Sequence, residues 1–327
     1  MMKALRYASQ DHPVVDEIEI PEISADEVLI ASRVVGVCHS DIELLAGRAI
    51  IPFSYPLIPG HEWAGEVAKV GEKVTDFVVG DHVVGECVIG DDHFGCSIDG
   101  AAAQYFVVKA EWLHKLPPEM PWTNGALVEP FSVAYYALTR AGNINASDTL
   151  VLLGAGPIGL AVTAAAVKMG ARTIVADPNP HRRTAALSLG AAHAVAPEEL
   201  DELLDELTSG RGADVVVEAS GQPTVMARAL ELVAFGGRVA FIGVDVGREA
   251  SAKLGLIQSK GLKITGSVGS PGVWPETIRF LAQSGIDLSP LVTHRFTIDT
   301  ALDALDAALH PESTIKAHIE LDSPVFG

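Results

Sequence analysis

The sequence is poor in cysteine and in basic residues. Only Cys38, Cys87 and Cys96 occur among 327 residues. This makes the disulfide framework of a secreted protein improbable and favours a reducing, cytoplasmic compartment. Lysine and arginine number 23 against 42 aspartates and glutamates, a net charge of −19. Such a surface repels phosphate backbones and anionic lipids, so we expect neither nucleic acid nor a membrane as a partner.

Targeting and membrane-spanning signals are also absent from the pattern. Residues 1–13 contain no apolar h-region, so no signal peptide is expected. The uncharged run at residues 150–167 is long enough for a membrane helix. However, Gly-Ala-Gly-Pro at 154–157 would break such a helix, and the flanking residues show no topogenic charge pattern. We therefore exclude a membrane span.

That run instead opens a motif of strand, glycine turn, helix, second strand and acidic residue. Residues 150–153 predict a strand buried on both faces, and residues 160–169 predict a helix of small residues that ends at Gly170. Residues 173–176 predict the second strand, which leads to Asp177. This order is typical of a dinucleotide-binding unit and is more specific than a glycine turn alone.

The glycines of G-A-G-P-I-G each have a reason in dinucleotide binding. Gly154 allows the sharp turn, and Gly156 lets the backbone approach a pyrophosphate at the helix N-terminus. Gly159 lets the helix pack closely on the strand. Pro157 and Ile158 lie within the same turn and are included among the predicted cofactor-binding residues.

The choice between NAD and NADP depends on the end of the second strand. Asp177 stands there, near the spacing of about 20 residues at which an acid accepts hydrogen bonds from the adenosine ribose. Its charge would repel a 2′-phosphate, which favours NAD. Arg182 and Arg183 follow closely, so Arg182 is kept as a cofactor contact and NADP as an alternative.

The chain contains two regions with different patterns. Residues 1–120 are β-rich, with predicted strands at 4–7, 14–20, 27–37, 63–70, 82–84 and 105–108. A helix at 124–140 leads into alternating helices and buried strands, the strands at 150–153, 173–176, 214–218, 238–242 and 263–266. This alternation indicates a parallel, doubly wound sheet. The tail predicts helices at 274–285 and 301–309 and a strand at 315–321 that returns to the β-rich part. We predict an α/β protein with one domain at 1–130 and 268–327 and a second at 131–267.

Side chains that bind metals gather in the β-rich part. Cys38 lies in Gly-Val-Cys-His-Ser-Asp at 36–41, His61 and Glu62 are adjacent, and Glu129 falls at the junction of the two regions. Thiolate, imidazole and carboxylate donors together suit Zn²⁺. Each residue alone has an ordinary interpretation as a buried small side chain, a core or surface histidine, or a solvated charge. The combination favours a zinc site.

With these residues the sequence resembles the zinc-dependent medium-chain dehydrogenase/reductase family, which contains alcohol and polyol dehydrogenases. The resemblance spans nearly the whole chain and is carried by GVCHSD at 36–41, GHEWAGEV at 60–67, LVEPFSVAYYAL at 127–138, GAGPIG at 154–159 and THRF at 293–296. EP at 129–130 is more similar to the polyol, sorbitol-dehydrogenase-like branch than to the simple ethanol branch. The resemblance implies a GroES-like catalytic domain, a Rossmann nucleotide domain, and a homo-oligomer that is either a dimer or a tetramer.

The resemblance also implies that Cys38 and His61 bind a catalytic zinc. In the polyol branch Glu62 completes the protein ligands, and Glu129 is an alternate ligand or an outer group. One thiolate and two carboxylates would place three negative charges on an ion of charge +2 and weaken it as a Lewis acid. We therefore predict that Glu62 and Glu129 do not both bind zinc in the reactive state, or that one of them is protonated.

In such a family zinc lowers the pKa of the substrate hydroxyl, hydride passes to NAD, and a relay removes the proton. Ser40 matches the relay hydroxyl, although a turn hydroxyl bonded to backbone is its ordinary interpretation. His39 matches a position that contacts the pyrophosphate or assists the relay. Where relatives often have a histidine, this chain has Glu43, so either Glu43 accepts the proton or the relay ends differently.

A second departure concerns the structural zinc of many relatives, which four closely spaced cysteines hold. This chain has only Cys87 and Cys96 in a shortened segment, too few for a closed tetrahedral thiolate site. A mixed site that adds His93 with Asp91 or Asp92 remains conceivable but lacks a known spacing. We predict one catalytic zinc per subunit and no structural zinc.

Further cofactor contacts are expected at the carboxyl edge of the parallel sheet, where dinucleotides bind. Ser220 follows one predicted strand, and Gly243 and Val244 follow another. In the family the second position places backbone near the nicotinamide. Lys316 matches a basic residue that reaches the pyrophosphate, with a surface lysine as the alternative.

These observations predict a zinc-dependent, NAD-linked dehydrogenase of a secondary alcohol or ketone, with a polyol, cyclitol or sugar alcohol as the substrate class. The alternatives are a zinc-free NADPH-dependent quinone or enone reductase of the same superfamily and a nucleotide-binding protein without catalysis. The predicted pocket walls include Ile50, Ile51, Phe53 and Trp274. This apolar set argues against a highly hydroxylated substrate.

Overall fold

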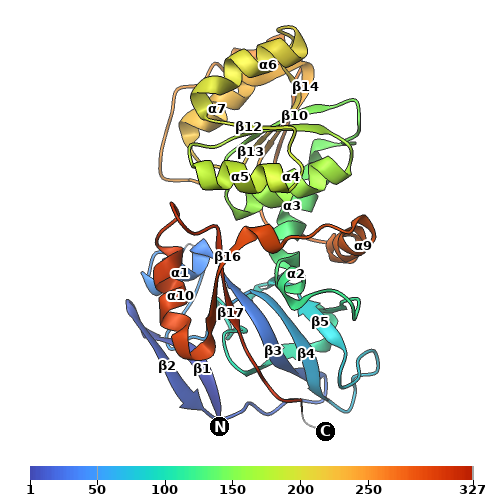
Figure 1. Ribbon diagram of the computed structural model, residues 1–327. Coiled ribbons are helices and arrows are strands. Elements are labelled where there is room, and N and C mark those ends of the chain that lie inside the picture. The colour runs from blue at the N-terminus through green and yellow to red at the C-terminus, as the bar shows by residue number, and fades with distance from the viewer. Residues whose placement is uncertain (50, 326–327) are drawn as a thin grey trace. The chain divides into compact units, whose positions relative to one another are not determined.

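The computed structural model describes residues 1–49 and 51–325 and divides the chain into two compact units (Figure 1). The first unit comprises Met1–Glu129 and Val292–Gly327, and the second comprises Pro130–Leu291. The first boundary is next to the predicted one. The second boundary differs, because residues 268–291 belong to the second unit and not to the first.

Aromatic packing explains this correction. Helix α9 (Trp274–Ser284) places Phe280 against Phe131 and Tyr135 of helix α3 (Val128–Ala141), with ring centroids 6.2 and 5.2 Å apart. Trp274 is buried and donates a hydrogen bond from its ring nitrogen to Ser270 Oγ at 3.1 Å. Residues from both sides of the predicted boundary therefore share one core.

The first unit is built on a seven-stranded mixed sheet. Its main path runs β16 (Val292–Thr297), β17 (Lys316–Glu320), β3 (Glu27–Val37), β4 (Glu62–Val70), β5 (His82–Gly85) and β9 (Leu113–Lys115), and β8 (Tyr105–Lys109) also pairs with β3. Two hairpins lie outside this path, β1 (Met2–Ser9) with β2 (His12–Ile18) and β6 (Val88–Ile89) with β7 (Asp92–His93). The helices are α1 (His39–Leu45), α2 (Trp122–Ala126) and α10 (Ala301–Ala308), with short 3₁₀ turns η1 (Ala110–Trp112) and η4 (Ile298–Thr300).

Large apolar side chains hold this sheet. Trp63 on β4 is fully buried and packs against Phe106 on β8 and against Phe94, with ring centroids 4.7 and 6.0 Å apart. β3 is buried along almost its whole length, which its run of valine, isoleucine and leucine residues favours. The ends of β3 and β4 are therefore held in fixed positions.

The second unit is a six-stranded parallel sheet with helices on both faces. The strand order is β12 (His193–Val195), β11 (Arg172–Ala176), β10 (Thr149–Leu153), β13 (Ala213–Glu218), β14 (Val233–Phe241) and β15 (Lys263–Gly266). Helices α4 (Pro157–Lys168) and α5 (Pro180–Ser188) cover one face, and α6 (Leu200–Thr208) and α7 (Pro223–Leu232) cover the other (Figure 1). The remaining helical segments are α8 (Gly255–Ser259), η2 (Pro197–Glu199) and η3 (Ser289–Leu291).

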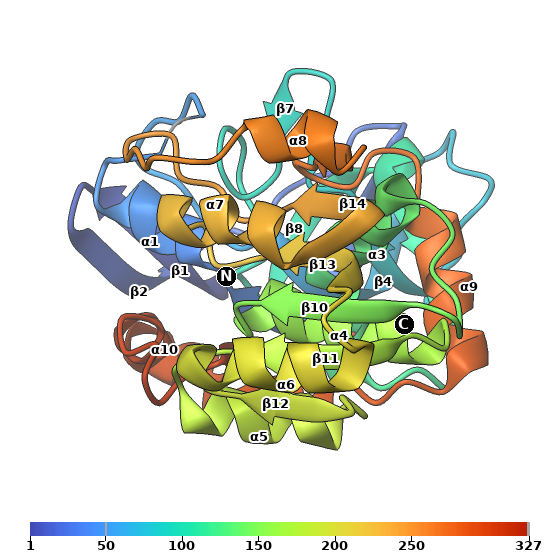
Figure 2. The same cartoon turned by 90° about the horizontal axis from the view of Figure 1, so that it is seen from above.

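Counted along the chain within this sheet, the strand order is 3-2-1-4-5-6, the order of the dinucleotide-binding fold. Figure 2 shows β10 between β11 and β13, so the order reverses beside β10. Ligands bind such sheets outside the carboxyl ends of the strands at this reversal. The predicted parallel, doubly wound sheet is confirmed.

Two helices differ from the prediction. The single helix expected at 124–140 is divided at Leu127 into α2 and α3, which places Glu129 in the first turn of α3. Helix α1, which begins directly after Cys38, was not predicted at all. Within residues 1–49 and 51–325, no helix combines the length and apolarity needed to cross a membrane.

Candidate metal and cofactor sites

Strand pairing brings three of the predicted metal ligands together in the first unit. β3 ends at Val37, and Cys38 follows as the N-terminal cap of α1. β4 begins at Glu62, directly after His61. Because β3 and β4 are antiparallel and Gly36 is in register with Glu62, the end of one strand lies beside the start of the other.

Cys38, His61 and Glu62 are the one group of three or more potential ligands found in the described part of the chain. Their ligand atoms all lie within 4.8 Å of one another, and His61 and Glu62 are buried. A Cβ on Gly36 would come within 2.6 Å of a Glu62 carboxylate oxygen, so this glycine makes room for the side chain. One thiol, one imidazole and one carboxylate converging in this way fit a zinc ion.

Asp41 supports two of these residues, although the prediction assigned it no role. Its Oδ2 accepts a hydrogen bond from the Cys38 backbone N–H at 2.8 Å, and its Oδ1 lies 3.7 Å from His61 Nδ1. Both Asp41 Oδ1 and His61 Nδ1 are buried without a hydrogen-bond partner among the described residues. A carboxylate behind a ligating histidine is typical of metal sites. Its position three residues after the helix-capping residue was the available signal.

The prediction for Lys316 requires a correction, because this residue is neither a surface lysine nor free to reach a pyrophosphate. Its side chain is 4% exposed, and its ammonium donates to Glu62 at 2.7 Å and to the Val37 carbonyl at 3.1 Å. Antiparallel pairing of β17 with β3, with Ala317 opposite Val37, fixes this position. Lys316 therefore belongs to the group around Cys38, His61 and Glu62.

The charges around this group act differently on the two candidate glutamates. Burial alone would raise the pKa of Glu62, but Lys316 and His61 outweigh it and the pKa is lowered. Burial raises the pKa of Glu129, and the neighbouring Glu62 charge adds to this effect. Without a metal ion, Glu62 is therefore the carboxylate that ionises more readily.

The pKa of His61 shifts in the direction opposite to that of a histidine that is only buried. Burial lowers its pKa, but the sulfur atoms of Cys38 and Cys96 and the Asp41 carboxylate raise it well above its ordinary value. Negative groups therefore surround His61, which is the environment that a bound cation also requires.

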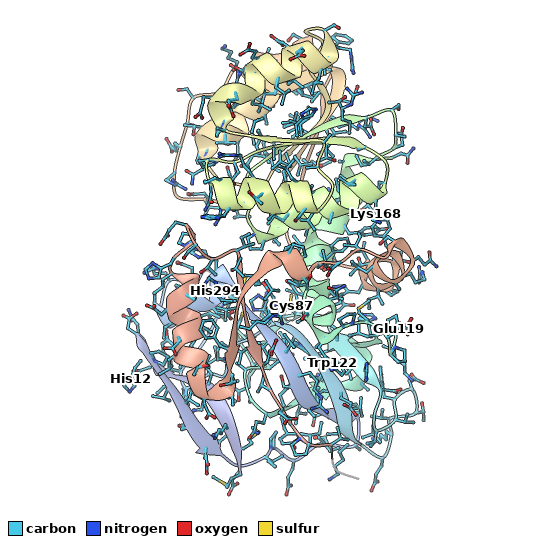
Figure 3. The ribbon with its side chains drawn as sticks, viewed as in Figure 1. His12, Cys87, Glu119, Trp122, Lys168 and His294 are labelled. Atoms are coloured by element: carbon cyan, nitrogen blue, oxygen red, sulfur yellow. The ribbon has the colours of Figure 1, made fainter. Side chains whose placement is uncertain are left out.

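Glu129 lies beside this cluster and has a different partner. It is 7% exposed, and its Oε1 accepts a hydrogen bond from Cys87 Sγ at 3.3 Å. Cys87 is labelled in Figure 3, and burial raises the pKa of its thiol well above the ordinary value. The shortened segment thus directs Cys87 toward Glu129 and Cys96 toward His61.

The glycine turn of the second unit has the predicted local geometry. Gly154 adopts a φ of +95°, and a Cβ there would lie 2.8 Å from the Ser220 backbone nitrogen. A Cβ on Gly159 would lie only 2.0 Å from the Gly154 carbonyl oxygen. At Gly156, which caps α4, a Cβ would meet no described atom within 4 Å. The space beside Gly156 fits an approaching pyrophosphate.

Asp177 lies under this turn at the end of β11. It is buried, its Oδ2 accepts a hydrogen bond from Ala155 N and its Oδ1 accepts one from Asn179 N, both at 2.7 Å. Arg183 donates to the carbonyls of Asp177 and Pro178 at 2.8 and 2.9 Å. Asp177 therefore also braces the glycine turn, a role that sequence reasoning missed.

The chain is similar to known proteins of one family. The alcohol dehydrogenase GroES-like domain matches residues 24–118, and the zinc-binding dehydrogenase domain matches residues 157–283. The chain is 33% identical to sorbitol dehydrogenase of Bacillus subtilis over 331 aligned residues, which cover 94% of each protein. The chain belongs to the zinc-type alcohol dehydrogenase family.

Solved structures agree with this assignment. The 2R,3R-butanediol dehydrogenase from Bacillus subtilis has a TM-score of 0.90 at 29% identity, with 98% of this chain and 100% of that chain covered. A zinc-binding dehydrogenase from Sinorhizobium meliloti 1021 bound to NADP has a TM-score of 0.88 at 25% identity, with 98% and 99% covered. The predicted GroES-like and Rossmann folds and the zinc-type alcohol oxidoreductase activity are confirmed.

The predicted relay residues of this alcohol dehydrogenase lie on α1. Ser40 Oγ is 3.4 Å from His61 Nε2, and the His39 side chain is mostly exposed, 3.6 Å from Glu43. Arg48 donates two hydrogen bonds to Glu43, at 2.9 and 3.0 Å, and lowers its pKa. A carboxylate held by arginine is a weak proton acceptor, so the geometry disfavours Glu43 as the end of the relay.

Some of the remaining predicted residues lie where they were expected, and others do not. Trp274 is 2% exposed within the core of the second unit, so it is not a pocket wall. Ile51 and Phe53 are half-buried against the core of the first unit, and Ile50 lies outside the described residues. Arg182 is half-buried at the start of α5. Ser220, Gly243 and Val244 follow β13 and β14 at the carboxyl edge, as expected.

Proposed function

We propose that this protein transfers a hydride between NAD(H) and a secondary alcohol or ketone at a single zinc per subunit. The observation that carries the proposal is the buried group of Cys38, His61 and Glu62 within a chain of the zinc-type alcohol dehydrogenase family. These three residues would hold the ion. When bound there, zinc lowers the pKa of a coordinated hydroxyl toward neutrality and polarises a carbonyl.

Residues next to the three ligands set the charge of Glu62, orient His61 and provide a path for the substrate proton. Lys316 keeps Glu62 ionised in a buried position. Asp41 faces His61 Nδ1 and thereby orients the ring. The Ser40 hydroxyl, 3.4 Å from His61 Nε2, is the proposed first carrier of the substrate proton. His39 at the exposed side of α1 is the proposed route onward, since Glu43 is paired with Arg48.

NAD is the proposed cofactor, bound at Gly154, Gly156 and Gly159 with Asp177 at the adenosine ribose. The Asp177 charge supports NAD over NADP. NADP is the second candidate, because one structural relative was solved bound to it. Steady-state kcat/KM with each nucleotide decides between NAD and NADP. Asp177→Ala should lower the ratio of kcat/KM with NAD to kcat/KM with NADP.

The proposed substrate class is a polyol, cyclitol or related vicinal diol. Support comes from the relatives named for sorbitol and for 2R,3R-butanediol, which both present a secondary hydroxyl beside a second hydroxyl. Butanediol is small and partly apolar, in keeping with the apolar side chains near Phe53. A panel of linear polyols, cyclitols and short diols would rank these classes by kcat/KM.

We also propose a cytoplasmic homo-oligomer. All three cysteines are free thiols, which suits a reducing compartment. In the second unit Val246 and Val268, which follow the carboxyl ends of β14 and β15, are more than four-fifths exposed, and a second copy would cover these apolar side chains. Light scattering should give a dimer or tetramer mass. Val268→Asp should weaken the assembly, whereas Leu187→Asp on α5 serves as the exposed apolar control.

Metal content tests the central claim first. Elemental analysis of wild type and Cys38→Ser, purified without added zinc, should give one zinc per subunit and none, respectively. Cys96→Ser, which changes a thiol outside the three-residue group, should retain the metal. Two zinc ions in wild type would show that the shortened segment binds metal. No zinc after reconstitution would contradict the mechanism and favour the zinc-free reductase.

A further inference from the structure

Glu218, the last residue of β13, is fully buried in the second unit and is not among the predicted cofactor-binding residues. Its Oε1 accepts hydrogen bonds from the backbone N–H groups of Ser220 at 2.8 Å and Gly221 at 3.1 Å, and from Ser220 Oγ. Its backbone carbonyl accepts from Ile242 N at 2.9 Å and Gly243 N at 3.1 Å. One residue therefore bonds to two loops that leave the carboxyl edge of the sheet.

The same two loops also contact the glycine turn. A Cβ on Gly154 would lie 2.8 Å from Ser220 N, and a Cβ on Gly243 would lie 2.1 Å from Gly221 N. The Ala219 backbone N–H donates to the Leu153 carbonyl at 2.9 Å. The glycine turn, residues 219–221 and residues 242–244 therefore meet in direct backbone contact, and the Glu218 carboxyl group lies beneath that junction.

We propose that Glu218 is a positioning residue for the dinucleotide, acting through Ser220 and Gly221 on the backbone that receives the nicotinamide half. This inference rests on the proposed function, because it assumes that the carboxyl edge binds a dinucleotide. Glu218 is fully buried and acts without touching the cofactor. Its Oε1 accepts hydrogen bonds from three donors of Ser220 and Gly221, and these donors would lose their acceptor if the carboxyl group were removed.

The second carboxylate oxygen of Glu218 shows that this side chain is not present for packing alone. Oε2 is buried, has no hydrogen-bond partner among the described residues, and lies 2.9 Å from the position of a Cβ on Gly243. A side chain chosen only for packing would not leave a polar atom unpaired there. The carboxyl group is therefore retained for the hydrogen bonds made by Oε1.

The test compares Glu218→Gln with Glu218→Met. Glutamine keeps an acceptor for Ser220 and Gly221, whereas methionine fills similar space without one. Calorimetric titration with NADH, NADPH and AMP gives the readout. Glu218→Met should weaken binding of the preferred dinucleotide about tenfold. The affinity of Glu218→Gln for this dinucleotide should stay within about twofold of wild type. AMP, which lacks the nicotinamide half, should change by less than about twofold in both variants.

Asp214 provides a matched control at the opposite end of β13. Its Oδ2 accepts from Thr149 N at 2.8 Å, so Asp214→Leu also removes a backbone-bonded carboxylate from the same strand. This variant should unfold more easily but bind the dinucleotide as wild type does. If Glu218→Met does not fold, Ser220→Ala removes one of the three hydrogen bonds to Glu218 Oε1. This variant should weaken dinucleotide binding about threefold and change AMP binding by less than about twofold.

Three outcomes would overturn the proposal. Wild-type affinity in Glu218→Met would show that the bonds to residues 219–221 do not matter. Equal losses for AMP and the dinucleotide, or an equal loss in Asp214→Leu, would show a general effect of destabilisation. Wild type that binds neither dinucleotide, although correctly folded, would overturn the proposed function and this inference with it.

Discussion

At the scale of single residues, the surroundings of each titratable group decide its charge. Lys316 lies against Glu62 and keeps the pKa of this carboxyl low despite burial, whereas burial raises the pKa of Glu129 beside Cys87. Only one of the two glutamates is therefore readily available as an anion. It stays a prediction that Glu62 and Glu129 do not both bind zinc in the reactive state, or that one of them is protonated. The opposite shifts of their pKa values give this prediction a physical basis.

His318 on β17 is a second buried group with an unusual environment. It is fully buried, and neither ring nitrogen has a hydrogen-bond partner within the described residues. Burial, together with the nearby Lys316 charge, lowers its pKa from 6.5 to about 3. Folded protein therefore keeps this ring neutral at a pH where the unfolded chain takes up a proton.

This shift predicts how stability depends on pH. The contribution of His318 is fully present above pH 6.5 and is lost as the pH falls toward 3, by about 1.4 kcal/mol per pH unit. His318→Leu should remove this part of the slope. Urea unfolding of both proteins at pH 7.5, 6.0 and 5.0 measures it, with His12→Gln on the exposed β2 as control. Parallel slopes for wild type and His318→Leu would contradict the prediction.

At the scale of elements, two positions of the glycine turn require glycine for different physical reasons. Gly159 has no room for a side chain, because a Cβ would lie 2.0 Å from the Gly154 carbonyl oxygen. Gly156 has ordinary backbone angles, φ −67° and ψ −177°, and no described atom within 4 Å of a Cβ. The fold requires Gly159, and we infer that a ligand requires Gly156.

Alanine at these two positions should therefore have opposite effects. Gly159→Ala should destabilise the protein without cofactor by about 1–3 kcal/mol through overpacking. Gly156→Ala should change stability by about 0.5 kcal/mol but weaken dinucleotide binding about tenfold, because its methyl group would meet the pyrophosphate. Chemical unfolding and calorimetric titration measure the two effects. Comparable stability losses in both variants would contradict the assignment.

At the scale of the whole molecule, the net charge of −19 is the dominant global property. Like charges repel one another in the folded state more than in the expanded chain, so they lower stability while they favour solubility. Salt shortens the range of this repulsion from about 30 Å at 0.01 M to about 8 Å at 0.15 M.

The melting temperature should therefore rise by a few degrees when NaCl is raised from about 0.01 M to about 0.15 M at pH 7.5. Differential scanning fluorimetry at fixed protein concentration measures this. Sucrose at equal osmolality controls for effects unrelated to charge. A melting temperature that falls with salt would show that attractive ion pairs, such as Lys3 with Asp299, outweigh the net repulsion.

Features that depend on local pattern could be predicted from the amino-acid sequence. Alternation of buried strands with helices predicted the parallel sheet, and the order of strand, glycine turn, helix and acid located Gly154, Gly156 and Gly159 correctly within it. The donor types at Cys38, His61 and Glu62 predicted one converging group. Such features are readable because each depends on residues that are neighbours in the chain or on the chemistry of a single side chain.

Contacts between distant segments could not be predicted in this way, because they arise from the folded arrangement. Lys316 meets Glu62 across 254 positions of sequence because β17 pairs with β3, which no local pattern reports. The second domain boundary moved to Val292 because aromatic side chains of α9 pack on α3. Charge, burial and strand register at such contacts arise from the fold as a whole, and they determine which of the candidate groups is ionised and which is available to a ligand.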